Sequence, residues 1–543
     1  MRLPKLRDLT EAQRSVYLYA PKDAHVLVQG PPGTGKTLIG WLRAIGLQKL
    51  GQPVALCMFN RVLMKYASNV DGAKKTQLPV TTARQWFLDW WMRAKLPPCA
   101  GSGDILVNAS YDDRSNVRKA GARWRKDVWR PWDHGKRGAW IVPSEEWSEK
   151  AESVAAWPLW QAPPAHPESE EEYDWNAIVD RVIVHSNDIE AEALSLGTLV
   201  IDEGQDFAAG FYRFLAILST IGSYRKVSFP LRCFVLADEN QQLTQFNSTL
   251  DDIRQGLSIT EKCRFSLVDN FRNTRQIAEL AAGFHAGVGA IPVMPERSGA
   301  MPLFVECSSI AACVKRIVTW IVNHPGKEVG VLVFRDTKRQ QMHERLEHEV
   351  ASIRGRNVTV QSYSWGTRAD NPIDNLVFDQ GDVVTVLNMQ SCKGLEFDAV
   401  FIVDLHDSVI ATLGADRFRM QMFVGVSRAR EWVEILESEA VPSNAPFLKE
   451  FPSEEFLVRG LQLRRPVTRT VVSNVTPVPV VQPPAAADWA APAEALARKH
   501  GFTFEDLRPN GCVWVYAPES FSKPMETLGF RYAARREAWW RKQ

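Results

Sequence analysis

Gly30-Pro31-Pro32-Gly33-Thr34-Gly35-Lys36-Thr37 is the stretch that decides how the first part of this chain folds. It fits the phosphate-loop pattern G-x-x-x-x-G-K-[ST], in which glycines let backbone N–H groups close around phosphate oxygens. The apolar run at 24–29 predicts a buried parallel strand before the loop, and 38–42 opens a helix after it. A helix N-terminus favours anions at this point. The context therefore indicates a nucleoside triphosphate site, with a chance glycine turn as the alternative.

The side chains of the loop suggest how the triphosphate is held. We expect Lys36 to neutralise the terminal phosphates and the Thr37 hydroxyl to ligate Mg²⁺. The predicted nucleotide-binding residues of the loop are Gly30, Pro31, Pro32, Gly33, Thr34, Gly35, Lys36 and Thr37.

Two further apolar runs end in carboxylates and amides, as parallel strands that bear a site do. Residues 199–201 lead into Asp202 and Glu203, so Asp202 is a predicted Mg²⁺ ligand and Glu203 is predicted to polarise the attacking water. Gln205 follows. Residues 234–237 lead to a second polar end that includes Gln241, suited to sensing a γ-phosphate; a capped loop after a core strand is the alternative.

Composition limits the class of protein only loosely. The 543 residues predict three or four domains, and the net charge of +2, from 65 basic and 63 acidic residues, says nothing about a nucleic-acid partner. The eight cysteines form no C-x-x-C pair, so we expect neither a zinc site nor a disulfide framework. We expect a cytoplasmic protein with reduced thiols, without a signal peptide or membrane anchor.

The motifs stand in the order of the UvrD/Rep/PcrA branch of superfamily 1 helicases, which the chain resembles across most of residues 9–435. Residues 9–13 resemble the Q motif, 202–205 motif II, 237–241 motif III, 270–272 motif IV, 390–397 motif V and 424–430 motif VI. The chain departs from the family at Ala237, Asn388 and Gln390, where Gly, Thr and His are usual. Those positions couple ATP to DNA in the family, so the strength of coupling is open.

The resemblance implies that ATP and Mg²⁺ are the cofactors. Gln13 would read the adenine, and Glu396, near Gly394, would hold the ribose. Arg272 and Arg428 would reach the γ-phosphate from a second domain, which makes hydrolysis depend on closure of the two domains; taken singly, either arginine would be a surface ion-pair residue. The predicted catalytic set is Lys36, Thr37, Asp202, Glu203, Gln205, Gln241, Arg272 and Arg428, with Thr37 and Asp202 at the metal.

The candidate DNA contacts lie outside these motifs. Phe59, Asn60, Thr82 and Phe246 are predicted to touch the strand, because aromatic side chains that stack on bases bind without sequence preference. The alternative is that Phe59 and Phe246 pack in the core.

An inserted segment at 94–196 is rich in tryptophan and cations in its first half, including Arg123 and Trp124, which we predict to bind DNA. Residues 111–143 resemble a small uncharacterised domain found beside plasmid primases, and a Trp-centred fold with a solvated basic rim is the alternative. Residues 528–532 and 538–540 echo 120–124 and 139–140. This similarity suggests a second nucleic-acid grip, or a cap that packs on the motor.

These observations predict an α/β protein with two RecA-like parallel-sheet P-loop domains, an inserted small domain and a C-terminal accessory module. The expected boundaries are 1–93 and 197–265 for the first core, 94–196 for the insertion, 266–460 for the second core with the family's 2B subdomain absent or vestigial, 461–490 for a Pro-rich linker and 491–543 for the small module.

The predicted function is an ATP-dependent helicase or translocase on single-stranded DNA, with a 3′ to 5′ direction implied by the resemblance. The alternatives are an ATP-driven DNA-sensing or protein-clearing switch within a larger repair or defence complex, a binding module whose ATPase has decayed, and an RNA track. A protein partner such as a nuclease is conceivable, and no membrane partner is expected.

Overall fold

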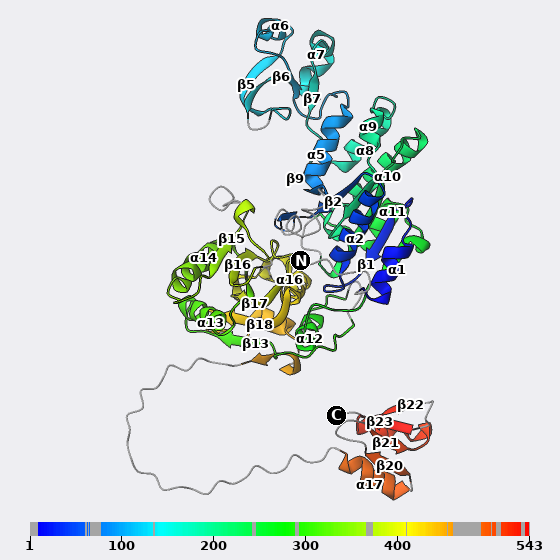
Figure 1. Cartoon of the computed structure of the whole chain (residues 1–543), viewed down its shortest axis with the longest axis vertical. Coiled ribbons are helices and arrows are strands. Elements are labelled where there is room, and N and C mark those ends of the chain that lie inside the picture. The colour runs from blue at the N-terminus through cyan, green and yellow to red at the C-terminus, as the bar shows by residue number, and fades with distance from the viewer. Residues whose placement is uncertain are drawn as a thin grey trace. The chain divides into compact units, whose positions relative to one another are not determined.

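The computed structural model describes residues 9–59, 62, 64–65, 78–133, 136–241, 246–287, 293–364, 373–378, 380–408, 410–452, 454–459, 490–500, 502–506, 512–533 and 538–541. The chain divides into two compact units, Met1–Arg465 and Pro466–Gln543. The first unit contains two parallel sheets, each with its own layers of helices (Figure 1). We call them core 1 and core 2.

Core 1 is a six-stranded parallel sheet in the order β12-β1-β11-β10-β2-β3. Its central strands are buried along their length because helices cover both faces, which is why they read as continuous apolar runs in the sequence. The strands are β1 (Val26–Gln29), β2 (Val54–Met58), β3 (Val80–Thr82), β10 (Thr198–Ile201), β11 (Arg232–Ala237) and β12 (Arg264–Ser266).

The helices of core 1 present apolar stripes to this sheet. On one face α2 packs against β2, β10 and β11, and the phosphate loop is the connection between β1 and α2. The helices are α1 (Glu11–Tyr19), α2 (Lys36–Lys49), α5 (Ala83–Ala94), α8 (Trp175–Val184), α9 (Ala191–Leu194), α10 (Ala209–Tyr224) and α11 (Leu250–Gly256).

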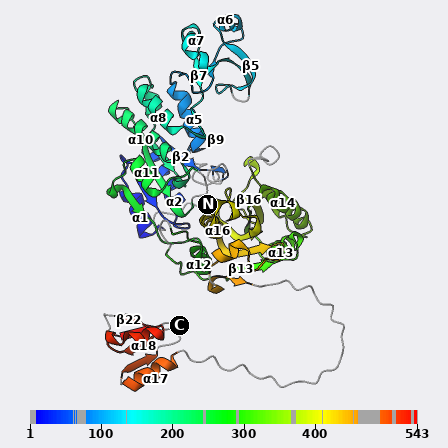
Figure 2. The ribbon, with the colours of Figure 1, turned by 180° about the vertical axis from the view of Figure 1, so that it is seen from behind.

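Core 2 is a seven-stranded parallel sheet in the order β15-β16-β14-β17-β18-β13-β19. The helices α13 and α14 lie side by side over one face of it (Figures 1 and 2), and α12 packs against α16 and β18. The elements are β13 (Leu303–Glu306), β14 (Glu328–Val333), β15 (Thr359–Ser362), β16 (Val383–Asn388), β17 (Phe397–Val403), β18 (Ala429–Glu437), β19 (Val458–Arg459), α12 (Arg275–Gly283), α13 (Ile310–Asn323), α14 (Asp336–Val350), α15 (Ile410–Leu413) and α16 (Ala415–Ser427).

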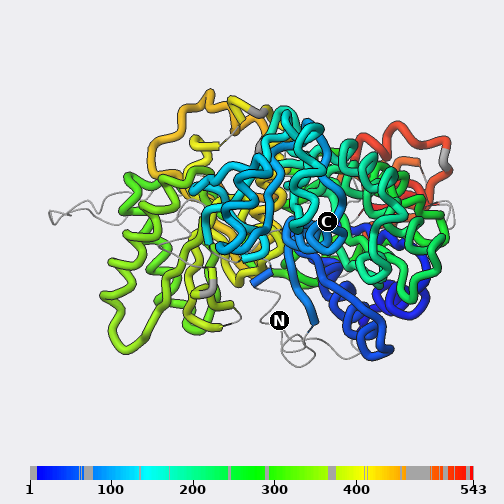
Figure 3. The backbone as a smooth tube through the Cα atoms, turned by 90° about the horizontal axis from the view of Figure 1, so that it is seen from above, coloured from blue at the N-terminus to red at the C-terminus, as the bar shows by residue number. Residues whose placement is uncertain are grey.

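The segment between α5 and α8, coloured from blue to cyan in Figure 3, forms a small antiparallel sheet in the order β5-β6-β4-β7 and a separate hairpin, β8-β9. Its helices α6 and α7 supply Val117 and Val154 to a core beneath that sheet. The elements are β4 (Ile105–Val107), α6 (Arg114–Lys119), β5 (Arg123–Trp129), β6 (Arg137–Val142), α7 (Trp147–Val154), β7 (Leu159–Gln161), β8 (Ala165–His166) and β9 (Ser169–Tyr173).

The second unit has a four-stranded antiparallel sheet in the order β20-β21-β23-β22 and a core of its own. Its elements are α17 (Ala491–His500), β20 (Thr503–Asp506), β21 (Val513–Tyr516), α18 (Ser522–Thr527), β22 (Arg531–Ala533) and β23 (Ala538–Arg541).

The predicted α/β class is confirmed: the chain has two parallel sheets, of the kind expected for RecA-like cores, and in addition small antiparallel sheets. The domain boundaries given above stay predictions. All eight cysteines are free. Across the described ranges, every helix falls short of the length and apolarity that a membrane crossing demands.

Candidate active site

The phosphate loop adopts a conformation that only glycine accepts readily at two points. Gly33 and Gly35 have φ of 80° and 82°, in the left-handed region. A Cβ added to Gly33 would lie 2.3 Å from Oδ1 of Asn270, and one added to Gly35 would lie 2.6 Å from Nε2 of Gln13. A side chain at either position would therefore collide with Asn270 or Gln13.

Lys36 is buried at the first turn of α2, and its ammonium group folds back onto the loop. Nζ donates to the carbonyl oxygen of Gly30 and, at 3.0 Å, to that of Pro31. Burial lowers the pKa of Lys36, because the charged form loses water. The ammonium therefore rests on backbone carbonyls, which are weaker partners than a phosphate.

Thr37 and Asp202 meet across the loop and the end of β10, where Oγ1 of Thr37 donates to Oδ2 of Asp202 at 2.7 Å. Burial, and then the charge of Glu203, raise the pKa of Asp202 to about 6. Burial also opposes the charge of Glu203, but Lys393, Lys36 and Arg428 outweigh it and hold the pKa of Glu203 at about 2. A hydroxyl beside a carboxylate is a donor set that suits Mg²⁺.

The polar ends of β10 and β11 form one hydrogen-bonded chain. Nε2 of Gln205 donates to Glu203 at 2.7 Å, and Oε1 of Gln205 accepts from the backbone N–H of Asp238 at 2.9 Å. Nε2 of Gln241 then donates to Asp238 at 2.6 Å. Gln205 and Gln241 thereby connect the carboxylates at the ends of the two neighbouring strands.

Two arginines reach this region from the side of core 2. Nη2 of Arg428 donates to Oε1 of Gln241 at 2.7 Å, and Arg428 is 1% exposed. Arg272 pairs with Glu396 at 2.6 Å, and Arg430 pairs with the other oxygen of Glu396 at 3.2 Å. Burial opposes the charge of Glu396, but Arg272 and Arg430 outweigh it and hold the pKa of Glu396 at about 2.

One pocket gathers most of the predicted ATP-site residues. Its lining is Pro32, Gly33, Thr34, Gly35, Lys36, Thr37, Leu38, Glu203, Gln241, Arg272, Gly394, Glu396 and Arg428. The remaining predicted residues lie around that lining: Gly30, Pro31, Asp202 and Gln205 through the hydrogen bonds described above, and Gln13 through Nε2, which donates to the carbonyl oxygen of Thr34 at 3.0 Å.

The side chains that line the pocket have the chemistry that a triphosphate with Mg²⁺ would need. Nε of Arg272 is buried and has no hydrogen-bond partner among the described residues, so the pocket wall presents an unsatisfied cationic donor. Lys36, Arg272 and Arg428 would hold the phosphates, and Thr37 with Asp202 would hold the metal.

Lys393 is a site residue that the sequence reasoning missed. It is fully buried, and its Nζ pairs with Asp206, donates to the carbonyl oxygen of Gln241 and lies 3.6 Å from Glu203. It is in the connection between β16 and β17 of core 2, whereas its partners follow β10 and β11 of core 1. Its place in the segment that resembles motif V was a signal; its partners could not be read from the sequence.

The structure does not bring the predicted DNA contacts of core 1 together as it does the predicted ATP-site residues. Phe59 is half-buried, packs edge-on against Phe207 and has Nζ of Lys393 5.9 Å from its ring centre. The Thr82 hydroxyl caps α5 by accepting from Gln85, and Phe246 packs against His166 of β8. Asn60 lies outside the described residues.

Arg123 and Trp124 lie on β5, the outermost strand of the inserted sheet. Trp124 is 45% exposed, while Arg123 pairs with Glu146. Trp129, at the end of the same strand, is 54% exposed and has the guanidinium of Arg137 4.6 Å from its ring centre. The strand therefore offers aromatic rings beside cations, which a nucleic acid can use.

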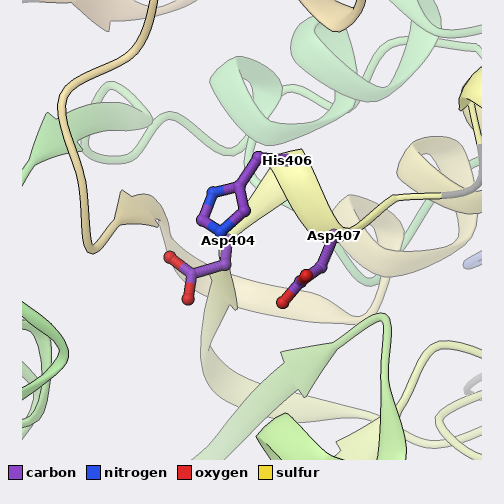
Figure 4. A group of neighbouring side chains, drawn as sticks. All are labelled: Asp404, His406 and Asp407. Atoms are coloured by element: carbon purple, nitrogen blue, oxygen red, sulfur yellow. The ribbon is translucent and has the colours of Figure 1, made fainter.

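A second polar cluster lies after β17, where Asp404, His406 and Asp407 approach one another (Figure 4). Nζ of Lys338 pairs with Asp404 at 2.6 Å, and His406 pairs with Glu437 at 2.8 Å. Asp407 pairs with Arg335 at 3.2 Å, so each aspartate of the cluster has a protein cation beside it, and we assign the cluster a structural role.

Comparison with known proteins identifies the last part of core 2. Residues 383–436, which contain the predicted motifs V and VI, match the family profile of the UvrD-like helicase C-terminal domain. This match confirms the predicted resemblance. A search of curated proteins gives no match.

Two solved structures are similar to the chain at low identity. The C-terminal domain of a possible DNA helicase from Lactobacillus plantarum WCFS1 is 15% identical with a TM-score of 0.25, over 35% of this chain and 98% of that one. The helicase MrfA bound to DNA is 10% identical with a TM-score of 0.39, over 82% of this chain. The match spans about half (51%) of the MrfA chain.

Proposed function

We propose that this chain, which has a UvrD-like helicase C-terminal domain at residues 383–436, is an ATP-driven motor on single-stranded DNA. The observation that supports this most is the composition of one pocket: the phosphate loop and Glu203 from core 1 line it together with Arg272, Glu396 and Arg428 from the side of core 2. A site completed by two cores is active only when they are together, so hydrolysis and movement of the cores are coupled.

The residues have separate roles in this proposal. ATP bound with Mg²⁺ supplies the γ-phosphoryl group that is transferred to water. Glu203 orients and polarises that water, since its low pKa keeps it ionised. Arg272 and Arg428 stabilise the charge that develops on the phosphoryl oxygens, and Gln241 positions Arg428. Lys36 and Thr37 hold the phosphates and the metal.

We propose single-stranded DNA as the nucleic acid that the motor moves along because of the side chains near the cores. Phe59 is half-buried beside Lys393, and Trp124 and Trp129 expose their rings on β5, so stacking surfaces occur in both the motor and the insertion. Thr82, Phe246 and Arg123 stay candidate contacts. The 3′ to 5′ direction is part of the proposal through the family resemblance alone.

The test is ATP hydrolysis measured alone and with single-stranded DNA, duplex DNA or single-stranded RNA, with Lys36→Ala as the blank. We expect strong stimulation by single-stranded DNA that is lost in the variant. Stimulation by RNA alone would mean that the motor acts on RNA. Hydrolysis that no nucleic acid changes would overturn the proposal of a motor and favour a switch controlled by another partner.

A further inference from the structure

The second unit and the inserted segment have sheets of the same topology. In the inserted segment β5 pairs with β6, β6 with β4 and β4 with β7, all antiparallel. In the second unit β22 pairs with β23, β23 with β21 and β21 with β20, again all antiparallel. A helix of 6 residues connects the equivalent strands in each case, α6 between β4 and β5 and α18 between β21 and β22.

The two sheets also agree in register. Residues 105–124 correspond to 513–532 at one constant offset, which places Trp124 opposite Trp140 and Tyr532 opposite Trp539. Each helix is followed by a left-handed glycine, Gly121 with φ of 96° and Gly529 with φ of 76°. The similarity between the two short sequence segments is therefore a similarity of fold.

The order of the elements along the chain differs by a circular permutation. In the inserted segment the pair α7-β7 comes last, whereas its counterpart α17-β20 comes first in the second unit. The two ends of an inserted segment must lie close together, because both connect to the same domain. The first and last strands of this segment satisfy this, since Ile105 of β4 pairs with Gln161 of β7. A module joined at one end has no such requirement.

The two copies differ on the sheet face opposite the helices. In the inserted segment Leu106 and Ile141 are buried on this face, beneath side chains that include Val128 and Trp132. Those covering residues come from 126–138, between Arg125 and Ala139; the equivalent connection in the second unit is only 534–537. The shorter connection has no Val or Trp in its sequence, the residue types that cover this face in the inserted segment.

Tryptophans replace the aliphatic residues on that face of the second unit. Trp514 and Trp540 occupy the positions of Leu106 and Ile141, are half-buried, and have ring centres 6.2 Å apart with planes at 35°. Arg531 is exposed and lies opposite Trp540 in the register. Val513, Val515 and Trp539 point to the other face and form the core with the helices.

The surrounding sequence is cationic. Residues 531–542 contain five Lys or Arg and one Glu, while Glu505 lies opposite Trp514 in the register, so the positive charge is concentrated toward the Arg531 end of the row. A row of flat rings with an arginine at its edge matches the chemistry of an unpaired nucleic-acid strand, whose bases stack and whose phosphates need cations. A duplex hides its base faces and would gain only the phosphate contacts.

We propose that Arg531, Trp540 and Trp514 form a second binding site for single-stranded DNA in the C-terminal module. The proposal deepens the proposed function, on which it rests for the identity of the strand. Two sites on one chain raise its hold on DNA while the motor changes its nucleotide state, because the second site binds without needing ATP.

The test uses the full chain, without nucleotide, and follows the fluorescence anisotropy of a labelled oligothymidine. We expect Trp514→Ala and Trp540→Ala each to raise Kd about fivefold or more, the loss that a removed base stack produces. Arg531→Ala should raise Kd and reduce its salt dependence. The matched control is Lys523→Ala on α18, an exposed cation on the helix side, which should change Kd little.

Unchanged DNA affinity in the folded tryptophan variants would overturn the proposal. If ATP hydrolysis changes in these variants while DNA affinity does not, the face packs against protein, and the proposal is again overturned. Trp540→Phe keeps a stacking ring and should retain most of the binding. If both alanine variants unfold, exposed Arg531 decides the question. Failure here is separate from failure of the motor, which is judged by DNA-stimulated hydrolysis.

Discussion

At the scale of single residues, the ionised groups of the candidate site already have partners within the protein. Lys36 rests on loop carbonyls, and Arg428 rests on Gln241. Arg272 is paired with Glu396, although its Nε stays unsatisfied. Binding of a triphosphate would therefore give Lys36 and Arg428 charged partners in place of neutral ones, at a site whose charged groups are already in position.

Replacement of Arg428 tests the proposed role in hydrolysis. We expect Arg428→Ala to lower kcat by about 10³-fold or more, since a positioned arginine supplies that much in comparable sites. ATP binding should change much less. The measurement is steady-state hydrolysis with saturating single-stranded DNA.

The control for this variant is Arg419→Ala on α16, the helix that ends just before Arg428; Arg419 pairs with Glu450 and is partly exposed. It should keep its kcat. Equal losses in both variants would mean that the effect comes from a disturbed α16 and would contradict a role at the phosphate.

Lys393 gives a prediction about stability. Lys393→Met removes the buried ammonium that pairs with the carboxylate of Asp206, and we expect the free energy of unfolding to fall by about 3–5 kcal/mol. Adding Asp206→Leu removes that carboxylate as well and should recover most of the loss. Urea unfolding followed by tryptophan fluorescence measures both.

The comparison variant for Lys393 is Lys327→Met, which breaks an ion pair with Glu431 that solvent reaches. It should cost about 1 kcal/mol or less. If the double variant is no more stable than Lys393→Met alone, the buried pair is not what stabilises this junction between the cores.

At the scale of elements, the N-terminus of α1 holds a side chain that also contacts the phosphate loop. The Thr10 hydroxyl accepts from the backbone N–H of Gln13 at 3.2 Å, and Oε1 of Gln13 accepts from the N–H of Thr10, which completes a capping box. The same amide donates through Nε2 to Thr34 in the phosphate loop. The cap therefore fixes the side chain that we propose reads the adenine.

Removal of the cap tests this connection. Thr10→Ala should lower stability by about 1 kcal/mol and raise the KM for ATP, because Gln13 loses its fixed orientation. The kcat should stay the same, and Thr10→Ser, which keeps the acceptor oxygen, should behave like the original. A KM that is equal in all three proteins would contradict a contact between Gln13 and the nucleotide.

At the scale of the whole molecule, contacts between the two cores converge on the pocket. Nδ2 of Asn273 donates to the carbonyl oxygens of Ser427, at 3.2 Å, and Ala429, at 2.5 Å, while the N–H of Phe271 donates to Gly33 at 2.9 Å. The segment after β12 thus touches both the phosphate loop and the last motif. Anything that binds in the pocket contacts both cores and is expected to hold them together.

Ligand-linked stability tests this arrangement. At 100 times its Kd, a non-hydrolysable ATP analogue with Mg²⁺ should stabilise the folded state by about 2.7 kcal/mol, seen as a rise in Tm. Lys36→Ala should abolish the rise. A rise that survives in the variant, or that needs no Mg²⁺, would place the nucleotide elsewhere.

Much of the site was predictable because its signals are local. The glycines of the phosphate loop, the apolar runs and the carboxylates at Asp202 and Glu203 lie within short stretches, where chain geometry alone places them at the end of a strand. The sequence by itself therefore determined the α/β class and predicted which residues of the phosphate loop and the strand ends come together.

Only the tertiary structure decided which distant groups meet. The burial of Lys393 against Asp206, the pairing of Arg272 with Glu396, and the neighbouring rings of Trp514 and Trp540 all depend on contacts between segments that are apart along the chain. Such contacts leave no periodic or spacing signal, because their energy comes from packing and shared burial, which are properties of the folded chain.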